Sequence, residues 1–171
     1  MRYFSDSRIA SIELILSNNA SAGVIGRATN FRIPYVVFDK KDFYESQTIL
    51  QLLTKKKIDL IVLAGFIWLV PENLIHAFEK KIINIHPALL PGFGGKGYYG
   101  KAVHEAVIDS GAVMSGITVH YVNKQFDDGE IIFQAACHCS RNETADSLAT
   151  KIHALEYTYY PVVVEKILKL V

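Results

Sequence analysis

The chain has 171 residues, half of them hydrophobic, with 18 Lys and Arg against 17 Asp and Glu. This hydrophobic content is enough for a folded core and excludes a disordered chain. A net charge of +1 leaves no basic excess for a nucleic-acid backbone or an anionic membrane surface, so small molecules are the expected partners.

The sequence fits neither a membrane protein nor a disulfide-stabilised secreted domain. Apolar runs such as residues 60–65 fall far short of the roughly 20 residues that a bilayer requires. The two cysteines, Cys137 and Cys139, cannot make a disulfide framework, and the residues after Met1 lack the apolar core of a signal peptide. We therefore expect a cytoplasmic protein.

Four short β-branched runs alternate with amphipathic stretches in the first half of the chain. These runs cover residues 12–16, 35–38, 58–63 and 82–85. The alternation is typical of βαβ units and predicts an α/β fold with a doubly wound, mostly parallel, Rossmann-like sheet. Residues 1–8 are polar and are predicted to be the end of a helix, so the first strand of such a sheet is absent.

Helix signals fill the intervals between the runs. Asp42 and Glu45 have capping-box spacing ahead of a helix that should reach Lys56. Pro71 suits the first turn of another short helix. Residues 87–100 form a long loop rich in proline and glycine, and we expect this loop to serve a function because such loops often do.

The second half of the chain adds a helix and an antiparallel pair of strands, expected at residues 101–109, 116–122 and 130–136. The last helical region should begin at Asn142 or Thr144. Pro161 should break or kink it, because proline removes a backbone hydrogen bond. No internal repeat or linker interrupts the sequence, so we expect a single domain over residues 1–171.

The densest chemistry lies at the end of the fourth run. Asn84 and His86 are two residues apart and therefore share one face of the expected strand. A carboxamide N–H and an imidazole can together hydrogen-bond an oxygen that gains negative charge, as acyl transfer requires. Taken alone, the same residues would equally fit a buried histidine and an asparagine that satisfies loop backbone.

Three further stretches give this pair a context: Ala64-Gly65-Phe66, the run from Ser115 to Val122, and Asp127-Asp128-Gly129. In order and spacing, these stretches and Asn84-Ile85-His86-Pro87 resemble the folate-dependent formyltransferases. The resemblance is strongest to those members that act on glycinamide ribonucleotide in purine (IMP) biosynthesis. It covers nearly the whole chain, from residue 17 to residue 161.

The resemblance implies transfer of a formyl group from 10-formyltetrahydrofolate, a cosubstrate, to the amine of glycinamide ribonucleotide, with no metal. Asn84, His86 and Asp127 take the places of the family's catalytic residues. Asn84 and a protonated His86 would stabilise the oxyanion, while Asp127 would orient His86 and relay a proton through water. Asp128 adjoins Asp127, and the spacing from His120 favours Asp127.

The resemblance also implies binding residues for both small molecules. Family members hold folate with the loop after the Ala-Gly-Phe strand and the loop before the catalytic Asp, which predicts contacts at Phe66, Ile67, Trp68, Leu69, Val70, Val122 and Asn123. The corresponding ribonucleotide-binding residues are Pro87, Ala88 and Glu156. Neither nucleic acid nor a membrane is an expected partner, and a homodimer is compatible with the family.

The start of the chain departs from the family pattern. Relatives have a first strand and a Ser-Gly-x-Gly-Ser-Asn-like turn whose backbone N–H groups hold the phosphate, whereas Met1 falls within the helix that follows. We therefore expect an N-terminally shortened formyltransferase domain, and a non-catalytic folate-binding remnant is one alternative. Formyltetrahydrofolate deformylase is another alternative, although Pro87 stands where those enzymes carry a second histidine.

Overall fold

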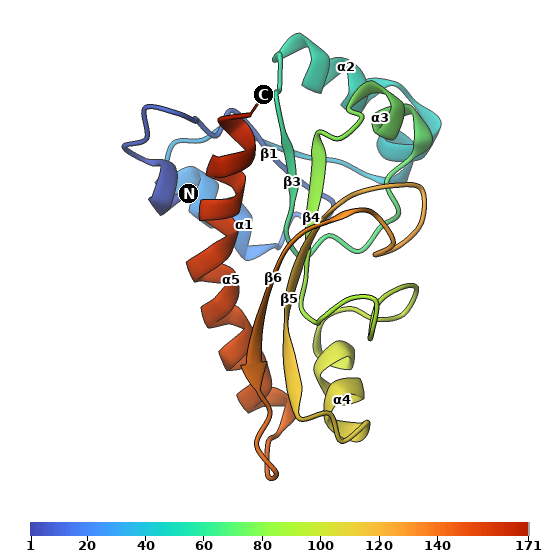
Figure 1. Ribbon diagram of the computed structural model, residues 1–171. Coiled ribbons are helices and arrows are strands. Elements are labelled where there is room, and N and C mark those ends of the chain that lie inside the picture. Colours follow the sequence, from blue (N-terminus) through green and yellow to red (C-terminus); the bar gives the residue numbers. More distant parts are fainter. Residues whose placement is uncertain (171) are drawn as a thin grey trace. The chain divides into compact units, whose positions relative to one another are not determined.

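The computed structural model describes residues 1–170, and the chain divides into two compact units (Figure 1). The first comprises Met1–Asp59 and the chain end from Leu168, and the second comprises Leu60–Ile167. Every predicted site residue belongs to the second unit. The expectation of one domain stays a prediction.

The first unit is a βαβ unit followed by two short helical segments. In chain order it contains a 3-10 turn (Arg2–Phe4), β1 (Ile15–Ser17), α1 (Gly23–Asn30), β2 (Tyr35–Val37), a π-helical turn (Lys41–Glu45) and α2 (Thr48–Lys55). Strands β1 and β2 pair in parallel, with Ile15 opposite Tyr35. The predicted βαβ alternation is therefore confirmed here, on strands shorter than expected.

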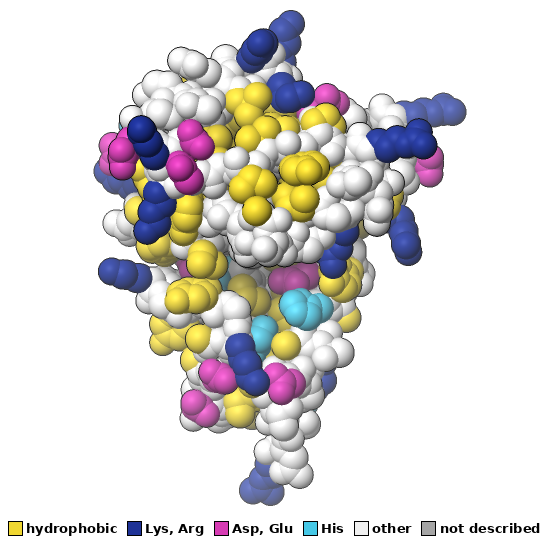
Figure 2. All heavy atoms as spheres, turned by 180° about the vertical axis from the view of Figure 1, so that it is seen from behind, with side chains coloured by type: hydrophobic (Ala, Val, Ile, Leu, Met, Phe, Trp, Pro, Cys, Tyr) yellow, Lys and Arg dark blue, Asp and Glu magenta, His cyan; other side chains and the backbone are white. Residues whose placement is uncertain are grey.

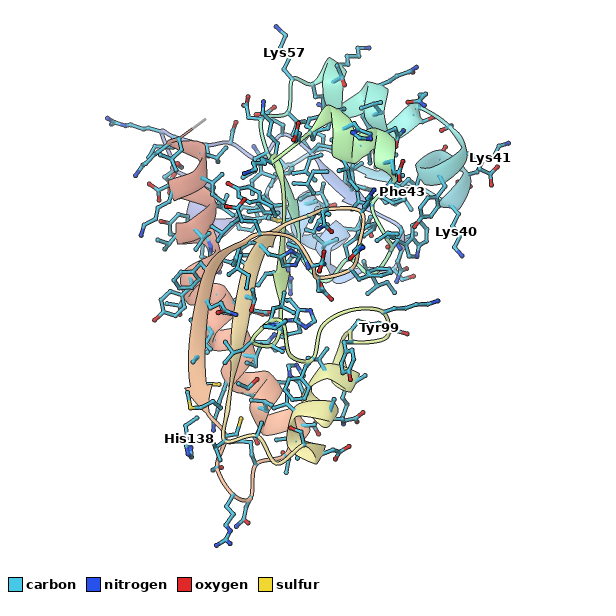
Figure 3. All side chains as sticks on the ribbon, turned by 45° about the vertical axis from the view of Figure 1, so that its right-hand side comes forward. Lys40, Lys41, Phe43, Lys57, Tyr99 and His138 are labelled. Atoms are coloured by element: carbon cyan, nitrogen blue, oxygen red, sulfur yellow. The ribbon has the colours of Figure 1, made fainter. Side chains whose placement is uncertain are left out.

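The apolar periodicity of the sequence marks the buried side of this unit. Ile49 and Leu53, one turn apart on α2, are both buried. Phe43 is also buried, with its ring centroid 5.2 Å from that of Phe38, whereas Lys41 points outward (Figure 3). Burial of these side chains fixes which face of each short helix packs on the rest of the unit.

The helix predicted over residues 42–56 is wrong in detail. It is interrupted at Ser46, whose backbone is extended with φ of −128°. The Ser46 hydroxyl accepts a hydrogen bond from the N–H of Thr48 at 3.1 Å and so starts α2 anew. The predicted cap is also displaced, because the N–H of Asp42 donates to the carboxylate of Asp39 at 2.8 Å.

The expectation of a helix end over residues 1–8 is also wrong. The helical part is a single 3-10 turn at Arg2–Phe4. The hydroxyl of Ser7 accepts hydrogen bonds from the N–H groups of Ile9, at 3.1 Å, and Ala10, at 3.3 Å. Such local side-chain bonds offer the backbone an alternative to the helix.

The second unit has a four-stranded sheet, and α4 and α5 lie on opposite sides of its β5 and β6 strands (Figure 1). Its elements are β3 (Ile61–Leu63), α3 (Glu72–Ala77), β4 (Ile82–His86), α4 (Lys101–Asp109), β5 (Met114–Tyr121), β6 (Ile131–His138) and α5 (Ala145–Leu168). The strand order is β3-β4-β5-β6, with β3 parallel to β4 and the other pairs antiparallel. The predicted α/β class with an antiparallel pair towards the C-terminus is confirmed.

Alternation along β4 and β5 separates two kinds of side chain. Ile83 and Ile117 are completely buried on one face of the sheet. On the other face Asn84 lies opposite His120, and His86 lies opposite Thr118. The sheet is covered on both faces, so these polar side chains are largely buried and need partners within the protein.

The last helix confirms one expectation and overturns another. Thr144, one of the two predicted starts, caps α5, because its hydroxyl accepts a backbone hydrogen bond from the first turn at 3.2 Å. Pro161 does not break the helix, which is continuous over Ala145–Leu168. The predicted break is wrong because proline costs one hydrogen bond here, while burial of Tyr160 and Val163 on either side holds the segment in place. The alternative of a kink stays a prediction.

The surface carries charges of both signs. On the face that Figure 2 shows, Lys and Arg side chains are spread out among acidic ones. No helix within residues 1–170 combines the length and the hydrophobicity that crossing a bilayer needs. The same residues contain no group of three or more His, Cys, Asp or Glu side chains placed to share a metal ion.

Candidate active site

Four polar side chains converge where β4 meets β5 in the second unit. Asn84 and His86 come from β4, His120 comes from β5, and Asp127 comes from the loop that joins β5 to β6. His86 and His120 are 3% and 2% exposed, and the Asp127 side chain is 11% exposed. The structure thus brings the three predicted catalytic residues together, with His120 as a fourth member.

Both ring nitrogens of His86 face acceptors. Nε2 lies 2.7 Å from the carbonyl oxygen of Phe93, and Nδ1 lies 3.4 Å from Oδ2 of Asp127. A carbonyl oxygen can only accept, so Nε2 carries a proton and donates it to Phe93. A second proton on Nδ1 would point at the Asp127 carboxylate, so this geometry accommodates both the neutral ring and the imidazolium ion.

His86 and Asp127 each influence the pKa of the other. Burial lowers the pKa of His86, and the Asp127 carboxylate and the Phe93 carbonyl oppose this effect without cancelling it. Burial raises the pKa of Asp127, but His120, the His86 charge and the N–H of Gly95 together bring it below its ordinary value. Asp127 is therefore ionised at neutral pH, beside a histidine that gives up its proton readily.

His120 holds Asn84 in one orientation. In the neutral ring, Nδ1 of His120 donates to the carbonyl oxygen of Tyr121, 2.9 Å away, and Nε2 is an acceptor, whereas a proton on Nε2 would point at Oδ1 of Asp127, 3.6 Å away. The Asn84 amide nitrogen lies 3.2 Å from this Nε2 and 3.4 Å from Oδ1 of Asp127. Each amide hydrogen thus has an acceptor, and the opposite orientation would place the amide oxygen against a carboxylate.

The Asp127 backbone has the left-handed conformation, with φ of 52°, which aspartate enters more readily than most residues. Its Oδ2 accepts a hydrogen bond from the N–H of Gly95 at 3.0 Å. A Cβ atom at Gly129 would lie 1.7 Å from the carbonyl oxygen of Tyr121, so glycine is required for this close approach. Asp128 points elsewhere: it accepts a hydrogen bond from Asn123 at 3.2 Å and is exposed.

A small pocket adjoins this cluster, with a cavity volume of about 40 Å³. Its walls include Asn84 and Asp127 together with six of the seven predicted folate contacts, namely Phe66, Trp68, Leu69, Val70, Val122 and Asn123. Ile67, the seventh, is half exposed and does not line the pocket. The Phe66 and Trp68 rings lie 6.1 Å apart, centroid to centroid, and together form an aromatic part of the pocket wall.

The three residues predicted for the ribonucleotide differ in their surroundings. Ala88 is completely buried directly after the strand that carries His86, and its neighbour Pro87 is half-buried. Glu156 on α5 accepts a hydrogen bond from Nδ1 of His153 at 2.9 Å. Burial lowers the pKa of His104 on α4, and the charges of His153 on α5 and of His86 on β4 lower it further.

The sequence did not single out Thr118 and Gln134. Thr118 lies directly opposite His86 on β5, and Gln134 lies opposite Thr118 on β6. The alternation of Thr118 and His120 with apolar residues is the signal that could have placed Thr118 on the same face as His86. Gln134 has no such signal, because its strand neighbours are a mixture of apolar residues.

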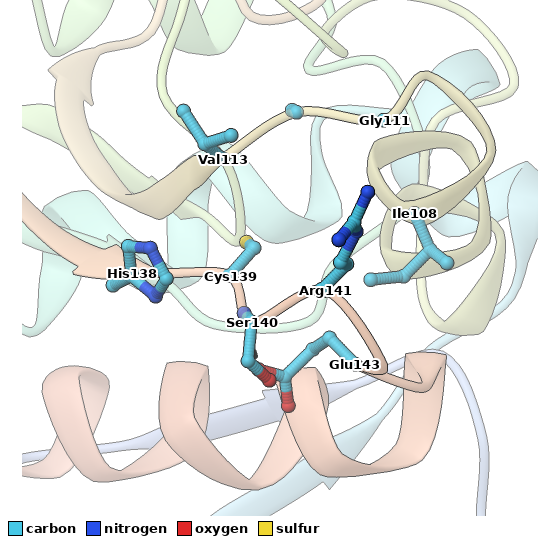
Figure 4. Close-up of a pocket in the computed structure, with 9 residues that line it drawn as sticks. Ile108, Gly111, Val113, His138, Cys139, Ser140, Arg141 and Glu143 are labelled. Atoms are coloured by element: carbon cyan, nitrogen blue, oxygen red, sulfur yellow. Dashed lines mark hydrogen bonds between the residues drawn. The ribbon is translucent and has the colours of Figure 1, made fainter.

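A much larger cavity, of about 440 Å³, lies at the other end of β5 and β6 (Figure 4). Its walls come from the turn after α4 and from residues that follow β6, among them Cys139 and Arg141. The only acidic side chain in its lining, Glu143, is paired with Lys151. Not one of the predicted site residues lines this cavity.

The sequence profile of the formyl transferase family matches residues 3–164. The chain belongs to this family. The chain is 40% identical over 158 residues to the chloroplastic phosphoribosylglycinamide formyltransferase of Arabidopsis thaliana, a match that covers 90% of this chain and 54% of the relative. It is 38% identical over 165 residues to the Bacillus subtilis phosphoribosylglycinamide formyltransferase, covering 94% and 82% of the two chains.

Solved structures agree with the assignment of this formyl transferase to the family. The phosphoribosylglycinamide formyltransferase of Anaplasma phagocytophilum superposes with a TM-score of 0.88 at 37% identity, over 98% of this chain and 78% of that one. The chain spans about half the length of the plant relatives that it matches. The predicted resemblance to formyltransferases is confirmed over nearly the whole sequence.

Proposed function

We propose that the chain transfers the formyl group of 10-formyltetrahydrofolate to the amine of glycinamide ribonucleotide, a step of purine (IMP) biosynthesis. The observation that carries this proposal is the buried contact between His86 and Asp127, 3.4 Å apart, beside Asn84. It occurs in a formyl transferase whose relatives include proteins named phosphoribosylglycinamide formyltransferase.

The reaction needs an oxyanion site and a group that moves a proton. The substrate amine attacks the formyl carbon, a C–N bond forms, and the formyl oxygen becomes negative. The N–H of Asn84 and the Nε2–H of His86 would donate to this oxygen, the latter in place of its bond to the Phe93 carbonyl. Asn84 would likewise exchange one of its bonds, to His120 or to Asp127, for a bond to this oxygen, and both donors already stand on one sheet face.

Asp127 is suited to the proton transfer. The attacking amine must lose a proton, and the folate nitrogen must gain one as its bond to the formyl carbon breaks. Asp127 is held ionised by Gly95 and its neighbouring histidines, so it can accept the first proton through water and return it to the leaving nitrogen. Contact with Asp127 would also keep His86 oriented.

The folate would lie against the aromatic wall formed by Phe66 and Trp68, next to Val122 and Asn123. Ile67 lies outside that wall, because it is half exposed and does not line the pocket. A cavity of about 40 Å³ is close to the volume of one water molecule, so entry of a pterin ring requires some of these side chains to move. The ribonucleotide would approach from Pro87 and Ala88, with Glu156 available for its ribose hydroxyls.

The direct test is a transfer assay with the complete chain. The chain is mixed with a 10-formyl folate and glycinamide ribonucleotide, and the formylated ribonucleotide and free formate are both quantified. Formylation of the ribonucleotide is the expected result. Formate release without a formylated product would indicate a deformylase, and folate binding without either product would indicate a non-catalytic remnant.

The proposal also covers the cellular compartment and the oligomeric state of the protein. We place the protein in the cytoplasm, on the ground that Cys137 and Cys139 are both free thiols. A homodimer is the assembly suggested by the family resemblance. Cell fractionation tests the first statement, and sedimentation of the purified chain over a range of concentrations tests the second.

A further inference from the structure

A row of three side chains crosses the sheet at the end of β4. His86 on β4 lies opposite Thr118 on β5, which in turn lies opposite Gln134 on β6. Thr118 is completely buried. Gln134 is exposed, although its amide nitrogen makes two hydrogen bonds within the protein. The row therefore runs from the proposed oxyanion donor to the outer strand of the sheet.

The Thr118 hydroxyl uses its full hydrogen-bonding capacity. It donates to the carbonyl oxygen of Ala88 at 2.7 Å, and it accepts from the N–H of Leu90 at 3.0 Å and from Nε2 of Gln134 at 2.9 Å. Nε2 of Gln134 also donates to the carbonyl oxygen of Leu90 at 3.0 Å. The side chains of Thr118 and Gln134 thus hydrogen-bond the N–H and the carbonyl oxygen of Leu90 and the carbonyl oxygen of Ala88.

We propose that Thr118 and Gln134 are positioning residues for formyl transfer, which fix the backbone after His86 so that His86 and the ribonucleotide amine meet in the reactive geometry. This proposal rests on the proposed function and extends it to residues with no expected contact to either substrate. Ala88 and Leu90 are buried, so water cannot replace the side-chain hydrogen bonds that hold them.

The anchored segment leads directly to the groups that bind the catalytic pair. Phe93, three residues after Leu90, provides the carbonyl that accepts from His86, and Gly95 provides the N–H that donates to Asp127. A shift of Leu90 would therefore be passed on to both contacts. Misplacement of a reacting group by about 1 Å costs on the order of a hundredfold in rate.

The folate pocket offers an internal reference. Its lining comes from residues 63–70, from Asn84 and His120, and from residues 122–127, and it includes neither Thr118 nor Gln134. A positioning role therefore predicts slower transfer and weaker use of the ribonucleotide with unchanged folate affinity. A general loss of structure would reduce all three together.

The experiment compares Thr118→Val with Thr118→Ser in the complete chain. Valine keeps the shape of threonine and removes the hydroxyl, whereas serine keeps the hydroxyl. We expect Thr118→Val to lower kcat about tenfold or more and Thr118→Ser to stay within about threefold of the unmodified chain. Folate affinity, measured by calorimetry, should be unchanged in both variants.

Ser115→Ala is the matched control. Ser115 is a buried hydroxyl residue on the same strand, 2% exposed, and its oxygen has no hydrogen-bond partner. Removing this hydroxyl should leave kcat unchanged. If Ser115→Ala slows transfer as much as Thr118→Val, or if Thr118→Val loses folate affinity in proportion to kcat, the positioning role is excluded.

Gln134→Met covers the case in which Thr118→Val does not fold. Gln134 is exposed, so its replacement does not disturb the core, yet its hydrogen bonds to the Leu90 carbonyl oxygen and to the Thr118 hydroxyl are both lost. We expect a kcat reduction of about threefold with folate affinity unchanged. A Gln134→Met chain with the kcat of the unmodified chain would overturn the proposal.

A second readout does not require turnover. The titration midpoint of His86, followed by NMR of its ring protons, reports on its surroundings: Asp127, His120 on β5 and His104 on α4. Loosening the Phe93 carbonyl should lower this midpoint in Thr118→Val but not in Thr118→Ser. If the unmodified chain transfers no formyl group, the proposed function fails, and an unchanged midpoint in Thr118→Val independently overturns the positioning role.

Discussion

The two cavities of the second unit differ in size and in the polar side chains beside them. The large one, about 440 Å³, is lined by the turn after α4 and the residues after β6, and its carboxylate, Glu143, has a pKa lowered to about 2 by its pairing with Lys151. The small one, about 40 Å³, is lined by His120 and Asp127, and Asp127 also contacts the buried His86.

We expect buried polar contacts to indicate the functional region of this unit better than cavity volume does. A buried ionisable group costs free energy unless partners stabilise it, and the cluster of Asn84, His86, His120 and Asp127 stabilises its members in turn. At the large cavity the side chain of Lys151, which pairs with Glu143, is 41% exposed, so water screens that ion pair. Four predictions test this contrast, beginning with the largest expected effect.

Replacing His86 should give the largest difference in transfer rate between a change beside the small cavity and a change in the lining of the large one. His86→Ala should lower the rate of formyl transfer about a hundredfold or more, because an oxyanion donor is lost, while folate binding is largely kept. His138→Ala, in the lining of the large cavity, is the matched control and should be neutral. An active chain that tolerates His86→Ala would remove His86 from the mechanism.

The choice between two adjacent carboxylates comes next. Asp127→Asn should lower turnover about tenfold or more, because the proton acceptor beside His86 is lost, whereas Asp128→Asn should change it less than about twofold. Steady-state assays of both variants at saturating substrates make the comparison. Equal losses, or the reverse order, would contradict the assignment based on the contacts of Asp127.

The aromatic wall should give a smaller effect, confined to folate. Trp68→Ala should weaken binding of a 10-formyl folate about fivefold, since it removes aromatic surface from the pocket, with kcat little changed. Ile67→Ala is the control, because Ile67 belongs to the same loop but does not line the pocket. Calorimetric titration with folate decides between them, and equal weakening by both changes would refute this picture of the wall.

The smallest effect concerns pH and stability. Burial, then the charges of His153 and His86, lower the pKa of His104 in the folded chain below the ordinary histidine value of about 6.5. Below that pH the unfolded chain binds more protons than the folded one, so the free energy of unfolding falls as pH falls from about 6.5 towards the folded pKa.

His104→Gln should therefore reduce the loss of stability on acidification. Urea denaturation at about pH 8 and about pH 5.5 would measure the difference, with His76→Gln, an exposed helical histidine, as the control. His86 contributes in the same direction, so part of the loss remains. A His104→Gln chain that loses as much stability as the unmodified chain would show that His104 is not a source of the effect.

Much of the candidate site could be predicted from local rules. The two-residue spacing of Asn84 and His86 placed them on one strand face, and the spacing of Asp127 from His120 identified the carboxylate that contacts His86. Thr118 and Gln134 were not predicted, because they bond to backbone groups of a loop that lies 28 or more residues away in sequence. Contacts of that range are set by tertiary structure, which a local pattern does not contain.

The fold shows the same division. The strand and helix order followed from apolar periodicity, and α4 was predicted at its observed bounds. The errors occur where a side chain competes with or supports the backbone: Ser46 interrupts a helix by bonding to a nearby N–H, and packing around Pro161 carries α5 across a proline. Such outcomes depend on which contacts dominate, and residue type alone does not decide that.

The left-handed backbone at Asp127 has a consequence for which residues evolution can use there. Few amino acids adopt a φ of 52° at low cost, chiefly glycine, asparagine and aspartate. Among these three, aspartate alone can accept a proton near neutral pH. The backbone conformation and the proposed proton transfer therefore favour the same residue for independent reasons.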